Sequence, residues 1–392
     1  MTNQIRSTDN PFQVLSGVAV RASVLRALLY LCHRRGFSVY QERMSQSSVL
    51  EEESAQTRQR PPRRKRLSNL FNLLGPLLIL VFVSGFFAVI MPSDVRESFF
   101  GIYNFKLILT QTVIVAIGAL GMTMIIVSGG IDLSVGSVIA LTSVLAAWLI
   151  KEGHSMSGAY ASAIGLGAFL GLVSGVIISL FNMTPFIVTL GMLGIARGVA
   201  KWLAENQTVN LPSNAPLSFI QVLMAIPDPE KPGSWFLSPG IVIAIELTVI
   251  MIIVMRRTVF GRYIFAIGSN EATARLCGIR TRLVKISIYT LAGVFFGLAG
   301  VFQFSRLRQG DPSTAIGIEL DIIAAVVIGG ASLNGGSGSI LGSMIGAITM
   351  SVLRSGSTQS DWPNYMQEII IGIVIILAVG LDKWRQSRMK AS

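Results

Sequence analysis

Long apolar stretches follow one another from Leu70 to Leu381, separated by short polar connections. An α-helix needs about 20 predominantly apolar residues to cross a bilayer. Only 13% of the residues are charged, whereas an ordinary soluble domain carries about 25%. The sequence therefore predicts an all-α, polytopic integral membrane bundle in which glycines break some helices. We count ten candidate spans, at residues 70–91, 107–127, 134–150, 159–181, 185–203, 238–255, 286–304, 318–334, 338–353 and 365–381.

The distribution of charge orients these spans. The net charge of +12 could indicate nucleic-acid binding, but cytoplasmic loops of membrane proteins are also rich in Lys and Arg. The bases gather at residues 63–66, 256–285 and 383–390, whereas the connection 204–237 is acidic. If both ends of the ten-span domain lie in the cytoplasm, the three basic segments fall inside and the acidic connection falls outside. We therefore expect membrane lipid, and no nucleic acid, as a partner.

Composition divides the chain into three parts. Residues 1–66 form a basic extension that we expect to be largely disordered or to lie at the membrane interface, unless translation begins at Met44. Residues 67–383 form the transmembrane domain, and residues 384–392 form a basic cytoplasmic tail. Cys32 and Cys277 both fall on the cytoplasmic side and are expected to be free thiols. Because His and Cys residues do not cluster, we expect no metal and no cofactor.

Regularly spaced glycines predict close helix packing, since small residues let helix backbones approach each other in lipid. They are Gly167, Gly171 and Gly175, then Gly293 and Gly297, then Gly338, Gly342 and Gly346.

One internal repeat has the pattern GGxxLxxGS. It occurs at residues 129–137 and again at 329–337, and each copy joins two apolar spans. Transporters often contain structural repeats whose broken helices form the solute path, although two ordinary Gly-rich turns would give the same pattern. The polar side chains expected along that path are Asp132, Ser134, Ser137, Ser332, Asn334 and Ser337.

The apolar region contains two acids of interest, Asp132 and Glu246. Asp132 is expected to be the N-cap of a helix that begins at Leu133, with contact to solute or to a partner helix as the alternative. Glu246 lies in the middle of a span and is nearly alone among intramembrane acids. Such acids are functional candidates, but a buried structural pair or a misplaced span edge would also explain Glu246.

The basic connection contains a short helix between Gly268 and Ile279. Ser269 or Asn270 can cap its start, Glu271 suits its first turn, and Gly278 suits its end. A capped helix of two turns in a cytoplasmic loop can serve as a rigid docking element, whereas a plain surface turn is the alternative. The chain has no G-x-x-x-x-G-K-[ST] phosphate cradle and no hydrolase motif. It is therefore not an enzyme by itself, and any energy from ATP must come from a second protein.

Four stretches carry a family resemblance: GGIDLSVGS (129–137), TPFIVTLGM (184–192), GRYIFAIGSNEATARLCGI (261–279) and VVIGGASLNGGSGS (326–339). Over residues 67–381 the chain resembles the permeases of ribose-, xylose- and galactose-type ABC importers. The resemblance implies monosaccharide import across a bacterial cytoplasmic (inner) membrane by a permease homodimer. It also implies an ABC ATPase subunit inside and a periplasmic or extracellular sugar-binding protein outside. The helix that couples to the ATPase would comprise Asn270, Glu271, Ala272, Thr273, Ala274, Arg275, Leu276 and Gly278.

Residues 1–66 depart from this family pattern. Related permeases for nucleosides or branched-chain amino acids are the nearest alternative. An ion-coupled secondary carrier is a different class, but carriers usually place several acids or histidines within the membrane. The chain does not name the sugar, because the external binding protein is expected to select it.

Overall fold

The computed structural model describes residues 64–212, 223–225, 237–363, 365–376 and 380. The chain divides into two compact units, Met1–Ser68 and Asn69–Ser392, and the second unit contains the helical bundle. Cys32, the basic tail and all but the last residues of the N-terminal extension lie outside the described residues.

Each of the ten expected spans coincides with a helix. They are α2 (Arg64–Ile90), α4 (Ile102–Val127), α5 (Val135–Lys151), α6 (Met156–Leu180), α7 (Pro185–Leu203), α9 (Pro239–Arg257), α12 (Thr281–Leu307), α13 (Ile318–Ile328), α14 (Ile340–Gln359) and the final helix at residues 365–376. Within the described residues, α4, α6, α7, α9 and α12 are long and apolar enough to cross a membrane. The prediction of a helical, polytopic bundle is thus confirmed, whereas ten crossings remain a prediction.

Several elements differ from expectation. A short helix α3 (Ser93–Phe99) follows α2, and α10 (Val259–Ser269) occupies residues that we expected to be a connection. Two-residue strands β1 (Val209–Asn210) and β2 (Gln309–Gly310) pair antiparallel. The span expected at 318–334 is shorter, since α13 already ends at Ile328.

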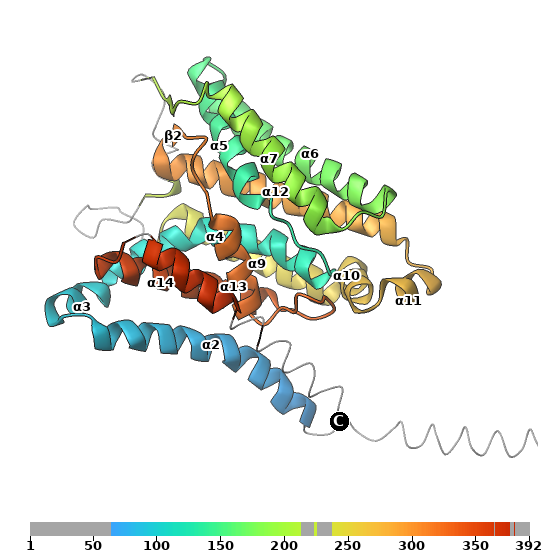
Figure 1. Ribbon diagram of the computed structural model, residues 1–392, viewed down its shortest axis with the longest axis horizontal. Coiled ribbons are helices and arrows are strands. Elements are labelled where there is room, and N and C mark those ends of the chain that lie inside the picture. Colours follow the sequence, from blue (N-terminus) through green and yellow to red (C-terminus); the bar gives the residue numbers. More distant parts are fainter. Residues whose placement is uncertain (1–63, 213–222, 226–236, 364, 377–379, 381–392) are drawn as a thin grey trace, which may run out of the picture. The chain divides into compact units, whose positions relative to one another are not determined.

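Helix α4 lies at the centre of the bundle, and 94% of its most apolar 18-residue stretch is buried. A helix that is hydrophobic all round is expected to be buried, and α4 has this character from Val113 to Val127 except for Thr123 and its two glycines. Helices α9, α12, α13 and α14 all contact it (Figure 1). The hydroxyl of Thr123 forms a hydrogen bond of 2.8 Å with that of Ser343 on α14, so the one polar side chain of this stretch is paired.

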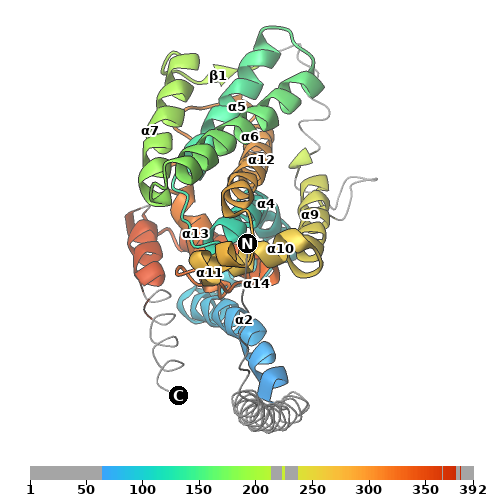
Figure 2. The same ribbon diagram turned by 90° about the vertical axis from the view of Figure 1, so that its right-hand side faces the viewer.

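The prediction of close packing at glycines is confirmed. Helices α6 and α12 lie side by side (Figure 2). A Cβ atom at Gly175 would lie 3.0 Å from the Cα atom of Ile286, and one at Gly297 would lie 2.9 Å from that of Ile164. On α14, Gly346 meets the backbone of Ala325 in α13. These helices can approach so closely only because the side chain is absent.

The two ends of the bundle carry different elements. Helix α10 and the short helix α11 (Glu271–Leu276) lie at one end, on the right of Figure 1, whereas α3 and β2 lie at the other. The candidate site forms at the end that carries α11.

Candidate functional site

The two copies of the repeat each begin where a helix ends. We call residues 129–137 the first Gly-rich segment and residues 329–337 the second. After α4, the N–H of Gly130 donates to Ile125 and that of Gly129 donates to Ile126; Gly129 has a φ of 86°. This is a Schellman motif, which needs a left-handed residue and therefore favours glycine.

A second Schellman motif closes α13. The N–H of Ala331 donates to Val326, and that of Gly330, whose φ is 87°, donates to Val327. The left-handed glycine is the first of the pair after α4 but the second after α13. Both copies thus contain a glycine with positive φ, but they differ in register by one residue.

The copies also differ downstream. Helix α5 begins at Val135, inside the first segment, whereas α14 begins at Ile340, after the second. The repeat in sequence therefore gives two non-equivalent breaks.

The two segments lie in direct contact. The N–H of Gly336 donates to the carbonyl oxygen of Val127, the last residue of α4, across 2.8 Å. A Cβ atom at Gly335 would lie 3.0 Å from the Cα atom of Gly129. Although they are 200 positions apart in the chain, the two copies form one junction.

Asp132 is not the N-cap of α5, which corrects our expectation. The helix begins two residues later than expected, and its N-cap position is occupied by Ser134. One carboxylate oxygen of Asp132 accepts from the N–H of Ser134 at 2.7 Å and from its hydroxyl at 2.6 Å. Asp132 therefore holds the turn that leads into the helix, and its side chain is buried.

The six side chains expected along the solute path fall into two groups. Asp132, Ser134, Ser137 and Ser332 are buried, whereas Asn334 and Ser337 are exposed. The hydroxyl of Ser137 donates to the carbonyl of Ser134 at 3.1 Å, and that of Ser332 accepts from the N–H of Asn334 at 3.3 Å. In this conformation the buried side chains serve the local turns.

The short helix expected between Gly268 and Ile279 is present as α11, and its docking role stays a prediction. The side-chain oxygen of Asn270 caps it by accepting from the N–H of Thr273 at 2.9 Å. A third Schellman motif ends it, with the N–H of Ile279 donating to Ala274 and Gly278 at a φ of 82°. Both expected caps are confirmed. We refer to Asn270–Gly278 as the docking helix.

Charged side chains fasten the docking helix to α12. Lys285 donates to one carboxylate oxygen of Glu271 at 2.6 Å, and Arg275 donates to the other at 3.3 Å. Burial raises the pKa of Glu271, but the hydrogen bonds and positive charges of Lys285 and Arg275 outweigh it and hold that pKa below its ordinary value. Ala274 is buried beneath the helix, whereas Leu276 is 89% exposed at its end. Leu276 is therefore an exposed apolar side chain at the end of this helix.

The end of α10, which leads directly into the docking helix, touches the junction. A Cβ atom at Gly268 would lie 2.6 Å from the nitrogen of Gly336 and would overlap the carbonyl of Val127. A Cβ atom at Gly336 would in turn lie 3.0 Å from the Cα atom of Ser269. The end of α10, the end of α4 and the second Gly-rich segment thus meet at one point, next to the docking helix.

One residue of this region was missed by sequence reasoning. Thr189 of α7 is fully buried, and its hydroxyl accepts from the N–H of Leu133 at 3.2 Å. The same hydroxyl lies 3.2 Å from the carbonyl oxygen of Ile131 and 3.0 Å from that of Pro185, to either of which it can donate. Thr189 therefore fastens the first Gly-rich segment to α7. In the sequence, the only feature that points to Thr189 is its position within the stretch TPFIVTLGM (184–192).

The acids of the bundle need a second correction. Glu246 is exposed in the middle of α9 and forms no ion pair with any residue that the structure describes, so it is not part of a buried structural pair.

Two further acids that sequence reasoning missed lie within the apolar region, because α13 begins with Glu319 and Asp321. Asp321 is buried and pairs with Arg354 of α14 at 2.5 Å. Glu319 accepts from the N–H of Gly317 at 3.3 Å, and its other oxygen faces Gly136 at the start of α5.

No group of three or more His, Cys, Asp or Glu side chains suited to a metal ion occurs in the part of the chain that the structure describes. Cys277 is a free, exposed thiol at the end of the docking helix.

Apolar spanning helices, two broken-helix segments in contact and a capped docking helix define a multi-pass membrane transport protein. Residues 104–379 match the protein family described as branched-chain amino acid transport system / permease component. The chain belongs to this family of permease components, which are transport components and not enzymes.

Curated relatives agree with this family. The chain is 39% identical to the ribose import permease protein of Escherichia coli over 303 residues, which cover 76% of this chain and 91% of the relative. It is 33% identical to the fructose import permease protein of Rhizobium meliloti over 317 residues, or 79% and 84% of the two chains. It is 34% identical to the L-arabinose ABC transporter permease protein of Azospirillum brasilense over 281 residues, or 70% and 79%. No solved structure matches the chain with statistical significance.

Proposed function

We propose that this chain is the membrane-spanning permease subunit of an ATP-driven importer of a monosaccharide, located in a bacterial cytoplasmic (inner) membrane. The observation that carries the proposal is the docking helix, which is capped at both ends and paired with α12 through Glu271 and Lys285. It directly follows Gly268 and Ser269 of α10, which contact the second Gly-rich segment. Relatives named for ribose, fructose and L-arabinose support a monosaccharide as cargo.

The assembly follows from the same proposal. A separate ABC ATPase would bind the docking helix from the cytoplasm, and an external sugar-binding protein would deliver the cargo. Two copies of the permease, embedded in lipid, would enclose the path between them. Residues 67–383 would form the permease domain, with residues 1–66 and 384–392 as a basic extension and a basic tail.

The solute path would follow the Gly-rich segments. Asn334 and Ser337 are exposed in this conformation, whereas Asp132, Ser134, Ser137 and Ser332 are buried. We infer that the buried four reach the solute only when the ATPase cycle separates the segments. Their short polar side chains could then exchange local hydrogen bonds for bonds to sugar hydroxyls.

A branched-chain amino acid remains the second candidate cargo, because the description of the family names this class. An uptake assay separates the sugar from the amino acid as cargo. The strain lacks the chromosomal copy of the gene and is tested with and without a plasmid copy, using labelled ribose, fructose, L-arabinose and leucine. We expect uptake of one of the sugars to depend on the plasmid. Plasmid-dependent uptake of leucine without that of any sugar would contradict the proposal.

A further inference from the structure

An apolar groove runs between three helices of the bundle. It has a volume of about 340 Å³ and lies between α4, α9 and α14. Its walls include Leu109 and Val113 from α4, Ile241 and Ala244 from α9, and Leu341 and Met344 from α14. No charged side chain lines it. Since the chain spans a membrane, a groove of this kind is suited to a hydrocarbon chain.

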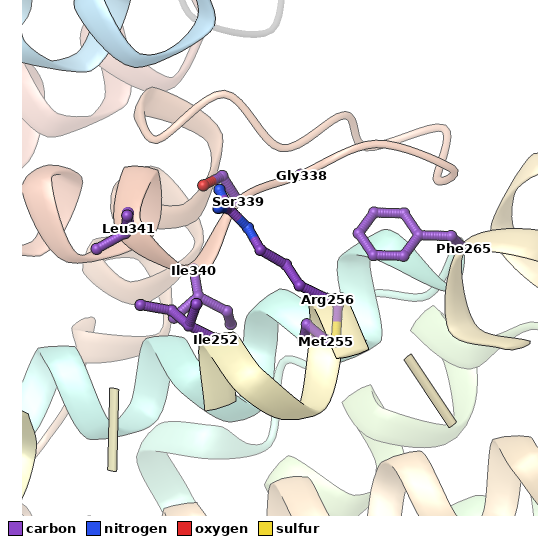
Figure 3. A pocket seen from close by; sticks show the side chains of 8 residues that line it. All are labelled: Ile252, Met255, Arg256, Phe265, Gly338, Ser339, Ile340 and Leu341. Carbon is purple, nitrogen blue, oxygen red and sulfur yellow. The ribbon is translucent and has the colours of Figure 1, made fainter. Parts of the chain in front are cut away.

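The groove continues into a smaller hollow of different chemistry. Ile252 and Leu341 line both, and the hollow adds Arg256 at the end of α9 and Ser339 at the start of α14. The side chain of Arg256 extends toward Ser339 (Figure 3). No described carboxylate lies within ion-pair distance of Arg256. A positive charge thus lies at one end of an apolar groove.

The start of α14 adds to this charge. Ser339 is the N-cap of this 20-residue helix, and its hydroxyl accepts from the N–H of Gly342 at 3.4 Å. The first N–H groups of a helix lack partners within the helix, and its N-terminus carries a partial positive charge. Such a terminus favours a phosphate group, and an arginine beside it can form charge-assisted hydrogen bonds with the same group.

We propose that the groove and the hollow together bind one anionic phospholipid of the cytoplasmic leaflet. Its phosphate lies between Arg256 and the start of α14, and one acyl chain occupies the groove. Basic pockets between helices on the cytoplasmic side of a membrane suit anionic headgroups, and the basic segment 256–285 belongs on that side by its charge. A free phosphate would leave the groove empty, so the lipid is the ligand that uses both parts.

The site adjoins the docking helix. Phe265 of α10 and Gly338 also line the hollow, and Gly338 follows the second Gly-rich segment directly. A bound lipid would therefore contact both α10, which leads to the docking helix, and the residue that directly follows the second Gly-rich segment. The site requires only that the chain spans the membrane, so it does not depend on the identity of the cargo.

Lipid titration of the purified, delipidated full chain tests the proposal. Native mass spectrometry would compare dioleoylphosphatidylglycerol with dioleoylphosphatidylcholine, and glycerol 1-phosphate would supply a headgroup without chains. We expect the anionic lipid to bind at least about tenfold more tightly than the zwitterionic one, because the choline cation of the zwitterionic lipid would lie near Arg256 and offset the attraction of its phosphate. Glycerol 1-phosphate should bind at least about tenfold more weakly than the anionic lipid, because it buries no apolar surface.

Variants separate the two parts of the site. Arg256→Gln should weaken phosphatidylglycerol binding at least about tenfold, whereas Arg257→Gln, a neighbouring base that lines neither cavity, should weaken it by about fivefold or less. Ala244→Phe should fill the groove and weaken both lipids, whereas Val199→Phe on the exposed face of α7 should not. If Arg256→Gln does not fold, Arg256→Lys replaces it and should keep part of the preference, because the charge remains. The proposal would be overturned if the two lipids bound with equal affinity, or if Arg256→Gln and Arg257→Gln had equal effects. It would also be overturned by normal lipid binding in Ala244→Phe, or by pairing of two chains through this face.

Discussion

The N–H of Gly336 donates to the carbonyl oxygen of Val127, and this single bond joins the second Gly-rich segment to the end of α4. The same carbonyl lies against Gly268 near the end of α10, two residues before the docking helix begins. A displacement of the end of α10, which leads into the docking helix, would therefore reach the second Gly-rich segment and the end of α4 without an intervening side chain.

Gly336 and Gly330 form a matched pair of glycines with positive φ. Alanine at either position costs about 1–2 kcal/mol of backbone strain. Gly336→Ala should cost more and should also reduce transport, because its Cβ atom would lie 3.0 Å from Ser269, whereas no atom lies within 4 Å of a Cβ at Gly330. Chemical denaturation in detergent, together with uptake, measures both effects. Equal losses in the two variants would show that the contact with Ser269 carries no function.

Asp132→Asn should leave uptake near normal. The amide oxygen of Asn can accept the two hydrogen bonds from Ser134 that the carboxylate accepts. Asp132→Ala should lower the free energy of unfolding by about 1–3 kcal/mol, because the buried N–H of Ser134 loses its partner. If Asp132→Asn expresses normally but does not transport, the charge itself acts on the solute or on a partner helix.

Thr189→Val should loosen the first Gly-rich segment from α7. The variant keeps the shape of the side chain but removes the acceptor for the N–H of Leu133, which costs about 1–3 kcal/mol. Thr349→Val is the control, because that buried hydroxyl donates only to the carbonyl of Ile345 in its own helix. We expect reduced uptake in the first variant and near-normal uptake in the second. Indistinguishable uptake rates would argue against a role for this fastening.

Native Cys277 allows a direct test of orientation, because it is exposed at the end of the docking helix. In a Cys32→Ser background, a membrane-impermeant maleimide should label Cys277 in inside-out vesicles and not in intact cells. A Glu205→Cys substitution in a chain without other cysteines should show the reverse, since Glu205 follows α7 on the opposite side. Labelling of Cys277 from outside would refute the assigned topology.

Local chemistry explains what the sequence could predict. The docking helix was predicted at both ends because Asn270 and Gly278 act within a few residues of where they stand. Helix α10 was missed because it follows α9 after only Thr258, whose hydroxyl caps it by accepting from the N–H of Gly261. Basic residues at this corner suggested a loop.

Contacts between distant residues could not be predicted in this way. Thr189 meets Leu133 from 56 positions away, and Asp321 is paired by Arg354, a residue of another helix. The register shift between the two Gly-rich segments depends on where α4 and α13 end, which the shared pattern does not encode. The exposure of side chains on the docking helix was also not apparent from the sequence: Leu276 is exposed, whereas Ala274 is buried.

ATP-driven uptake in proteoliposomes tests the central claim most directly. The permease would be reconstituted with its ATPase and with its sugar-binding protein on the outer side, and uptake of labelled sugar would be measured with and without internal ATP. We predict that uptake requires ATP, is lost in Leu276→Arg, and persists in Leu276→Met, because Leu276 is the exposed apolar side chain of the docking helix. Uptake that proceeds without ATP and collapses with an ion gradient, or that is unchanged in Leu276→Arg, would contradict the account.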